Sequence, residues 1–147
     1  MKVVIASDHG GFELKNEIKE WLSQKKGVVV VDGGPFHYDA VDSYADFVKP
    51  MVDGVRAEGA VGIFVCRTGN GPAMMANKFR GIRAAVCINT KYAHLARDHN
   101  NANVLCLGAD MMTMEDIQQT IDTFLNTGFG GGRHVPRIGA FEEFGER

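Results

Sequence analysis

The sequence predicts an α/β fold in which helices cover both faces of a five-stranded parallel sheet. Short apolar runs rich in β-branched residues recur along the 147-residue chain, with helical patterns between them. The five runs cover residues 3–6, 28–31, 61–65, 82–87 and 104–107. Each run is apolar throughout instead of alternating, so we expect every strand to be covered on both faces. The predicted architecture is a three-layer α/β/α, Rossmann-like fold.

Apolar residues at helical spacing predict the helices between these strands. In residues 12–26, Leu14, Ile18 and Leu22 lie on one stripe, and Gly27 ends the helix. Further helices are predicted over residues 44–57, 73–78, 90–98 and 114–125. Glycines are concentrated at residues 128–132, and Pro136 suits the first turn of a short last helix. We therefore expect a single domain over residues 1–147, with a C-terminal arm from about residue 128.

Composition and charge narrow the possible partners. The formal net charge of -2 gives no electrostatic reason to expect nucleic acid or an anionic membrane as a partner. No apolar run approaches the ~20 residues that span a membrane. The three cysteines are odd in number and lack C-x-x-C spacing, so a disulfide framework is not expected. We expect a cytoplasmic protein without nucleic-acid or membrane partners.

Polar and glycine-rich residues follow almost every predicted strand, where a parallel sheet forms its ligand crevice. These segments cover residues 7–11, 32–34, 66–71, 89–90 and 108–110. The 66–71 segment is the most informative because it joins a strand to a predicted helix. Gly69 and Gly71 let backbone N–H groups turn inward, which favours a pocket for an anion or a developing oxyanion.

The candidate side chains in the first and third segments also have structural interpretations. Cys66 could act as a base or nucleophile, with its thiol pKa lowered by the helix end and by Arg67. Alternatively, Cys66 is simply the last buried residue of its strand. Asp8 and His9 could hold a polyol or a phosphate, or could merely cap the first helix.

Later in the chain, His99 lies at a predicted helix C-terminus, which suits proton exchange near neutral pH. It could equally be an ordinary surface histidine. Arg133 and Arg137 have planar guanidinium groups whose paired N–H donors suit a phosphate, although exposed arginines are usually only solvated. His94 and Asp98 are four residues apart but have no third ligand, so no metal site is predicted.

Taken together, these segments resemble the family of ribose-5-phosphate isomerase type B and the galactose-6-phosphate isomerase subunits. Six segments match in order over nearly the whole chain, which is far more specific than any one motif. They are SDHGGFELK at 7–15, VVDGG at 30–34, C-x-TGNG at 66–71, ANKFRGIRAAVC at 76–87, RDHNNANVLCLGA at 97–109 and FGGGRHVPR at 129–137. The resemblance implies an aldose-ketose isomerase acting on a phosphorylated sugar, without a metal or cofactor.

The resemblance also implies roles for individual residues. A histidine matching His99 opens the sugar ring, a cysteine matching Cys66 carries a proton between C1 and C2, and Thr68 assists proton movement between the two oxygens. The remaining implied residues bind substrate: Asp8, His9 and Asn100 hold the sugar, the backbone of the 67–71 loop (Arg67, Gly69, Asn70, Gly71) stabilises the enediolate, and Arg133 and Arg137 bind phosphate. Two subunits share each active site in the family, so a homodimer or homotetramer is implied.

Three departures from the family pattern fall near the implied substrate. Arg67 stands where members commonly have glycine, and Asp110 stands where many have arginine. The tyrosine that usually follows Asp42 is absent, and Ser43 takes its place. We hypothesise that Arg67 partly replaces the missing charge at 110, and that Arg67 and the other departures select a sugar phosphate other than ribose 5-phosphate.

Three other functions compete with this interpretation. A cysteine-dependent phosphatase needs arginine six positions after its cysteine, where this chain has Pro72. A non-catalytic sugar-phosphate-binding subunit is conceivable, but Cys66, Thr68 and His99 are retained. Dinucleotide binding is disfavoured because residues 69–74 lack the last glycine of G-x-G-x-x-G and follow the third strand instead of the first.

Overall fold

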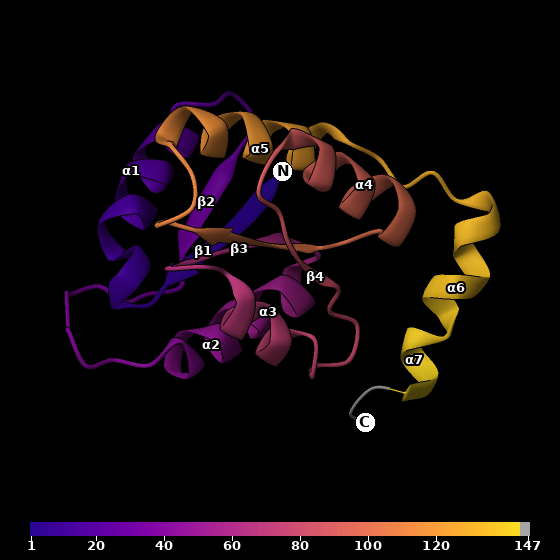
Figure 1. Ribbon diagram of the computed structural model, residues 1–147, viewed down its shortest axis with the longest axis horizontal. Coiled ribbons are helices and arrows are strands. Elements are labelled where there is room, and N and C mark those ends of the chain that lie inside the picture. The colour runs from indigo at the N-terminus through magenta and orange to yellow at the C-terminus, as the bar shows by residue number, and fades with distance from the viewer. Residues whose placement is uncertain (145–147) are drawn as a thin grey trace.

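The computed structural model describes residues 1–144, and its five strands form one parallel sheet (Figure 1). The strands are β1 (Lys2–Ser7), β2 (Val29–Asp32), β3 (Val61–Cys66), β4 (Ala84–Val86) and β5 (Val104–Gly108). Their order is β2-β1-β3-β5-β4. All strands run parallel, and the order in which successive strands are added reverses at β1. This strand pairs with β2 on one side and with β3 on the other. The predicted fold class is confirmed, and the ligand crevice of such a sheet is expected beyond the carboxyl ends of β1 and β3.

Helices form a layer on each face of the sheet. They are α1 (Phe12–Ser23), α2 (Tyr44–Glu58), α3 (Asn70–Ala76), α4 (Thr90–Asn100) and α5 (Met114–Asn126). Figure 1 shows α1, α4 and α5 on one face and α2 and α3 on the other. Side chains alternate along β3: Ile63 and Val65 pack with the first layer, whereas Phe64 and Cys66 pack with the second. This alternation directs the Cys66 thiol toward the α2–α3 layer.

The two edge strands differ from the prediction that every strand is covered on both faces. The central strands β1, β3 and β5 are almost wholly buried. In β2, however, Val29 is 61% exposed and Val31 is 37% exposed. All three residues of β4 are only partly buried. An apolar run predicts a strand but does not reveal whether the strand lies at the centre or at an edge.

Local signals set the ends of the helices that approach the crevice. A 3-10 turn, η1 (His9–Gly11), leads into α1. Ser43 and Asp46 form a capping box at the start of α2. Asn89 caps α4 by accepting a hydrogen bond from the Tyr92 amide at 3.0 Å. Asn101 ends α4 because it adopts the left-handed conformation, with φ of +46°.

The C-terminal arm lies apart from the three layers, at the right of Figure 1. It contains η2 (Gly132–His134), α6 (Val135–Gly139) and α7 (Phe141–Phe144), and none of their residues is buried. Pro136 lies in the first turn of α6, as predicted. The last residues of the predicted arm, 145–147, lie outside the described residues. Within residues 1–144, no helix combines the length and apolarity needed to cross a bilayer.

Candidate active site

The loops after β1 and β3 meet at the carboxyl edge of the sheet. Ser7 pairs with Val65, so residues 8–11 lie directly beside the loop that follows Cys66. A Cβ on Gly11 would lie 2.2 Å from the carbonyl oxygen of Val65, and one on Gly10 would lie 2.7 Å from Cγ of Arg67. The two loops approach so closely because both positions are glycine.

The thiol of Cys66 is buried at this edge. Cys66 is 6% exposed, and its Sγ accepts a hydrogen bond from the Gly69 amide at 3.0 Å. Burial raises the pKa of the Cys66 thiol, and the carboxylates of Asp8 and Asp110 raise it further, against the lowering effect of the Gly69 and Thr68 amides. The sequence-based expectation of a lowered thiol pKa is therefore wrong for the single chain.

The 67–71 loop has the backbone form that the glycines predict. Gly69 is left-handed, with φ of +86°, and packs against the backbone of β5. A Cβ on Gly71 would lie 2.8 Å from the ring of Tyr44, so this ring of α2 lies over the loop. The amide of Asn70 donates to Thr68 Oγ1 at 3.4 Å. Tyr44 is a residue that sequence reasoning did not single out, and it brings an aromatic hydroxyl group near the loop.

The side chain of Arg67 points to the side of the sheet opposite to that of the Cys66 thiol. Its Nη1 lies 3.3 Å from Asp110 Oδ2, and both side chains are exposed. Together with His9, Tyr38 and Met112, Arg67 lines a cavity of about 420 Å³ beside the start of α1. The guanidinium therefore flanks the 66–71 loop and does not contact the thiol, which explains why it fails to lower the thiol pKa.

Asp42, in the loop before α2, accepts hydrogen bonds from His9. One carboxylate oxygen, Asp42 Oδ1, lies 2.8 Å from both the backbone nitrogen and the ring Nδ1 of His9. The hydrogen bond to Asp42 raises the pKa of His9. Burial raises the pKa of neighbouring Asp8. Sequence reasoning noted Asp42 only as part of an altered segment, because a contact across 33 residues leaves no local signal.

The remaining predicted residues gather near the amino ends of the strands, opposite to the carboxyl ends that hold Cys66. His99 and Asn100 end α4, and the following residues lead directly into β5, whose first residue pairs with Gly62 near the start of β3. The His99 ring stacks on His134, with centroids 4.3 Å apart. Arg133 and Arg137 lie on either side of His134 in the sequence and are both exposed.

One chain therefore divides the predicted site into two groups. Cys66 pairs with Gly108 at the carboxyl end of β5, whereas the His99 group lies near Val104 at the other end. Four residue steps of about 3.3 Å give a separation along the strands of roughly 13 Å. The structure brings Asp8, His9, Arg67 and the 68–71 loop together at the carboxyl ends of β1 and β3, and it gathers His99, Asn100, Arg133 and Arg137 elsewhere.

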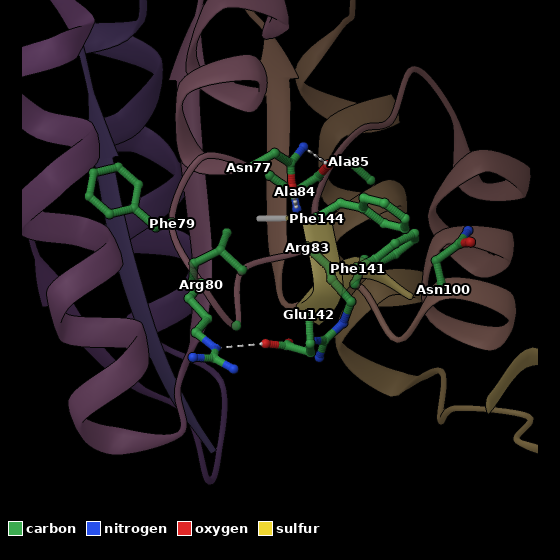
Figure 2. Close-up of a pocket in the computed structure, with 13 residues that line it drawn as sticks. Asn77, Phe79, Arg80, Arg83, Ala84, Ala85, Asn100, Phe141, Glu142 and Phe144 are labelled. Carbon is green, nitrogen blue, oxygen red and sulfur yellow. Dashed lines mark hydrogen bonds and ion pairs between the residues drawn. The ribbon is translucent and has the colours of Figure 1, made fainter. Parts of the chain in front are cut away.

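Figure 2 shows a second cavity, of about 410 Å³, at the edge that holds the His99 group. It lies between residues 77–85 and the C-terminal arm, and an ion pair between Arg80 Nε and Glu142 Oε2, 3.2 Å apart, joins its two walls. Among residues 1–144, Asn100 is the predicted site residue that lines it. No set of three His, Cys, Asp or Glu side chains within residues 1–144 is arranged to hold a metal ion.

Known proteins resemble this chain over nearly its full length. The profile of the family described as Ribose/Galactose Isomerase matches residues 3–141. The probable ribose-5-phosphate isomerase B of Mycoplasma genitalium is 45% identical over 138 residues, which are 92% of this chain and 90% of that protein. Ribose-5-phosphate isomerase B of Escherichia coli is 38% identical over 148 residues, which are 99% and 97% of the two chains.

Solved structures give the same result. The Mycoplasma genitalium ribose-5-phosphate isomerase B with bound ribulose-5-phosphate superposes with a TM-score of 0.92 at 43% identity, over 97% of this chain and 95% of that one. The Thermotoga maritima ribose 5-phosphate isomerase superposes with a TM-score of 0.91 at 45% identity, over 97% of both chains. The chain belongs to the ribose/galactose isomerase family.

Proposed function

We propose that this protein interconverts the aldose and ketose forms of a phosphorylated sugar. The observation that carries the proposal is the juxtaposition of Cys66 and the amide-rich 67–71 loop with Asp8 and His9 at the switch point of the sheet. Such an isomerisation needs a fixed base next to a carbonyl and donors preorganised where the oxyanion develops. A full-length relative with bound ribulose-5-phosphate supports the substrate class.

The proposed reaction assigns a separate step to each group. His99 opens the sugar ring, Cys66 moves a proton between C1 and C2 through a cis-enediolate, and Thr68 assists the proton transfer between the two oxygens. The amides of the 67–71 loop stabilise the enediolate. Asp8, His9 and Asn100 hold the sugar, and Arg133 and Arg137 bind its phosphate. No step uses a metal or cofactor.

We further propose that two copies of the chain complete each site, in a homodimer or homotetramer. The proposal is supported by the location of Cys66 and His99 near opposite ends of the strands of one sheet. It is also supported by apolar side chains on the arm, since Val135 is 54% exposed, Phe141 50% and Phe144 85%. In this arrangement residues 1–147 act as one isomerase domain, and the arm of one copy brings Arg133 and Arg137 to the Cys66 loop of the other.

Arg67 is proposed to bind the substrate and to help select it. Its pairing with Asp110 is exposed on both sides, and such surface pairs contribute at most about 1 kcal/mol. A substrate anion can therefore compete with Asp110 for the guanidinium. Arg67→Gly is expected to raise KM for the preferred sugar phosphate. An unchanged KM for every sugar phosphate would show that Arg67 does not compensate for the missing charge at 110.

A cytoplasmic location belongs to the same proposal. It is supported by Cys66, Cys87 and Cys106, which are all buried free thiols. Thiols persist without pairing in a reducing compartment.

An interconversion assay against tetrose, pentose and hexose phosphates tests the function. Cys66→Ala is expected to abolish turnover, whereas Cys87→Ala, which removes a buried thiol just after β4, is expected to retain it. Activity on one sugar that survives in Cys66→Ala would overturn the proposed role of the thiol. Absence of turnover on every sugar would favour a binding subunit, and hydrolysis of an aryl phosphate would favour a phosphatase.

A further inference from the structure

We propose that Asp42 is a positioning residue for the reaction, which holds the His9 ring in one orientation with Nδ1 protonated and leaves Nε2 to contact the substrate, as a donor when the ring is charged. This inference rests on the proposed function, because His9 is there a substrate-binding residue. It adds a residue to the site from a segment, 39–43, that precedes α2.

The geometry of the contact determines which ring nitrogen carries a proton. Asp42 Oδ1 lies 2.8 Å from Nδ1 and 2.8 Å from the backbone nitrogen of His9. A carboxylate only accepts hydrogen bonds, so Nδ1 must donate. Because the same oxygen also accepts from the backbone N–H, the ring is fixed relative to its own main chain.

Burial indicates that Asp42 is placed for this contact. The Asp42 side chain is 6% exposed, although the adjacent Val41 is 88% exposed. Its second oxygen, Oδ2, is buried and has no hydrogen-bond partner within residues 1–144. A buried carboxylate with one free oxygen is costly unless a charged partner is near. His9, which is 29% exposed, is the cation that the carboxylate contacts.

Other charges face His9 from the surrounding elements. Asp8 precedes it in its own loop, and Glu13 of α1 lines the same cavity. Arg67, from the loop after β3, lines the cavity as well. The hydrogen bond that His9 donates to Asp42 has the largest effect, so the pKa of His9 lies above its ordinary value. A charged His9 donates a charge-assisted hydrogen bond through Nε2, which is stronger than a neutral one.

Nitrogen-15 NMR of the imidazole rings tests the proposal on the whole protein. The wild type is expected to show His9 with a protonated Nδ1 across its titration. Asp42→Asn is expected to lower the pKa of His9 and to move the alkaline limb of the kcat/KM profile to lower pH. We expect kcat/KM to fall roughly tenfold, by analogy with the ~10–100-fold loss when the carboxylate partner of a metal-ligating histidine is removed.

Asp39→Asn is the matched control, because Asp39 lies in the same loop, is exposed, and its carboxylate accepts from the Val41 amide within that turn. It removes the same charge, and neither the His9 titration nor the pH profile is expected to move. A His9 pKa that is equal in folded Asp42→Asn and wild type would overturn the proposal. So would a loss of rate and thermal stability without a shift of the alkaline limb, which is the signature of a purely structural role.

Two measurements keep the test decisive if Asp42→Asn does not fold. A neutral wild-type His9 protonated at Nε2 would overturn the proposal, whereas one protonated at Nδ1 would support it. Asp42→Glu keeps the charge and is expected to retain the wild-type pH limb. The NMR result does not depend on turnover, so failure of the proposed isomerase function would be seen separately as absence of activity on every sugar phosphate.

Discussion

Lys15→Met is predicted to destabilise the protein by removing the buried ammonium that anchors the loop after β2. Lys15 is fully buried, and its Nζ donates to Asp32 Oδ1 at 2.8 Å and to the Pro35 carbonyl at 2.7 Å. Asp32 Oδ1 also accepts from the Gly34 amide, and the Gly34 carbonyl accepts from Ser7 at the end of β1. The ammonium thus links α1, the 33–35 loop and the strand that leads into the site.

The expected cost follows from the partners that remain. Removing one member of a buried ion pair costs about 3–5 kcal/mol. Asp32 is 16% exposed and keeps Lys19 Nζ at 2.6 Å, and methionine fills most of the lysine volume. We therefore expect a loss of about 2–3 kcal/mol, which lowers Tm by roughly 5–10 °C in a chain of this size.

Chemical and thermal unfolding followed by circular dichroism measure this loss. Lys19→Met is the control: Lys19 also pairs with Asp32 but is 39% exposed, so it should cost less than about 1 kcal/mol. A Lys15→Met variant no less stable than Lys19→Met would refute the reasoning.

The same variant has a predicted pH dependence. Burial alone raises the pKa of Asp32, but hydrogen bonds from Lys15, Lys19 and the Gly34 amide bring it below the ordinary value of 3.8. A lowered folded-state pKa contributes stability above the unfolded pKa, and this contribution is lost as pH falls through the folded value. The stability difference between wild type and Lys15→Met should therefore be largest near neutral pH and shrink below pH 3.8. A difference that is constant down to strongly acidic pH would contradict the ion-pair explanation.

Three further predictions concern the active site. Because burial raises the pKa of the Cys66 thiol, the thiolate absorbance that is lost in Cys66→Ala should appear only as pH rises through that raised pKa; a thiolate already fully formed in weak acid would contradict this. Gly11→Ala places a Cβ against the Val65 carbonyl and should cost about 1–3 kcal/mol in unfolding experiments, whereas Gly128→Ala, which meets no atom within 4 Å, should be nearly neutral; equal effects would refute the close approach. Mixing inactive Cys66→Ala and His99→Asn proteins should restore about a quarter of wild-type activity if two copies share each site, since half of the random dimers then hold one intact site; no recovery after verified subunit exchange would argue against sharing.

The fold could be predicted from the sequence to a large extent because apolar periodicity is a local property. The runs at residues 3–6, 61–65 and 104–107 became the buried strands β1, β3 and β5. Coverage of the edge strands could not be predicted, because Val29 and Val31 look like core valines in sequence. Their exposure depends on the sheet order, which is set by long-range pairing.

The site could be predicted only in part. The glycine-rich loops after β1 and β3 were identified from the sequence, and the sheet brings them together as expected. The raised pKa of Cys66 could not be foreseen, because it depends on burial and on the side of the loop to which the Arg67 side chain points. Asp42 was likewise missed, because its contact with His9 forms only when distant loops pack.

The sequence by itself determined the succession of strands and helices, the family and the residue types available for chemistry, because these depend on neighbouring positions and on motif order. Only the tertiary structure decided which of those residues meet. Cys66 lies at the carboxyl ends of the strands, whereas His99 lies near their amino ends. Burial then sets the pKa of each group, because desolvation and distant charges have no counterpart in local sequence.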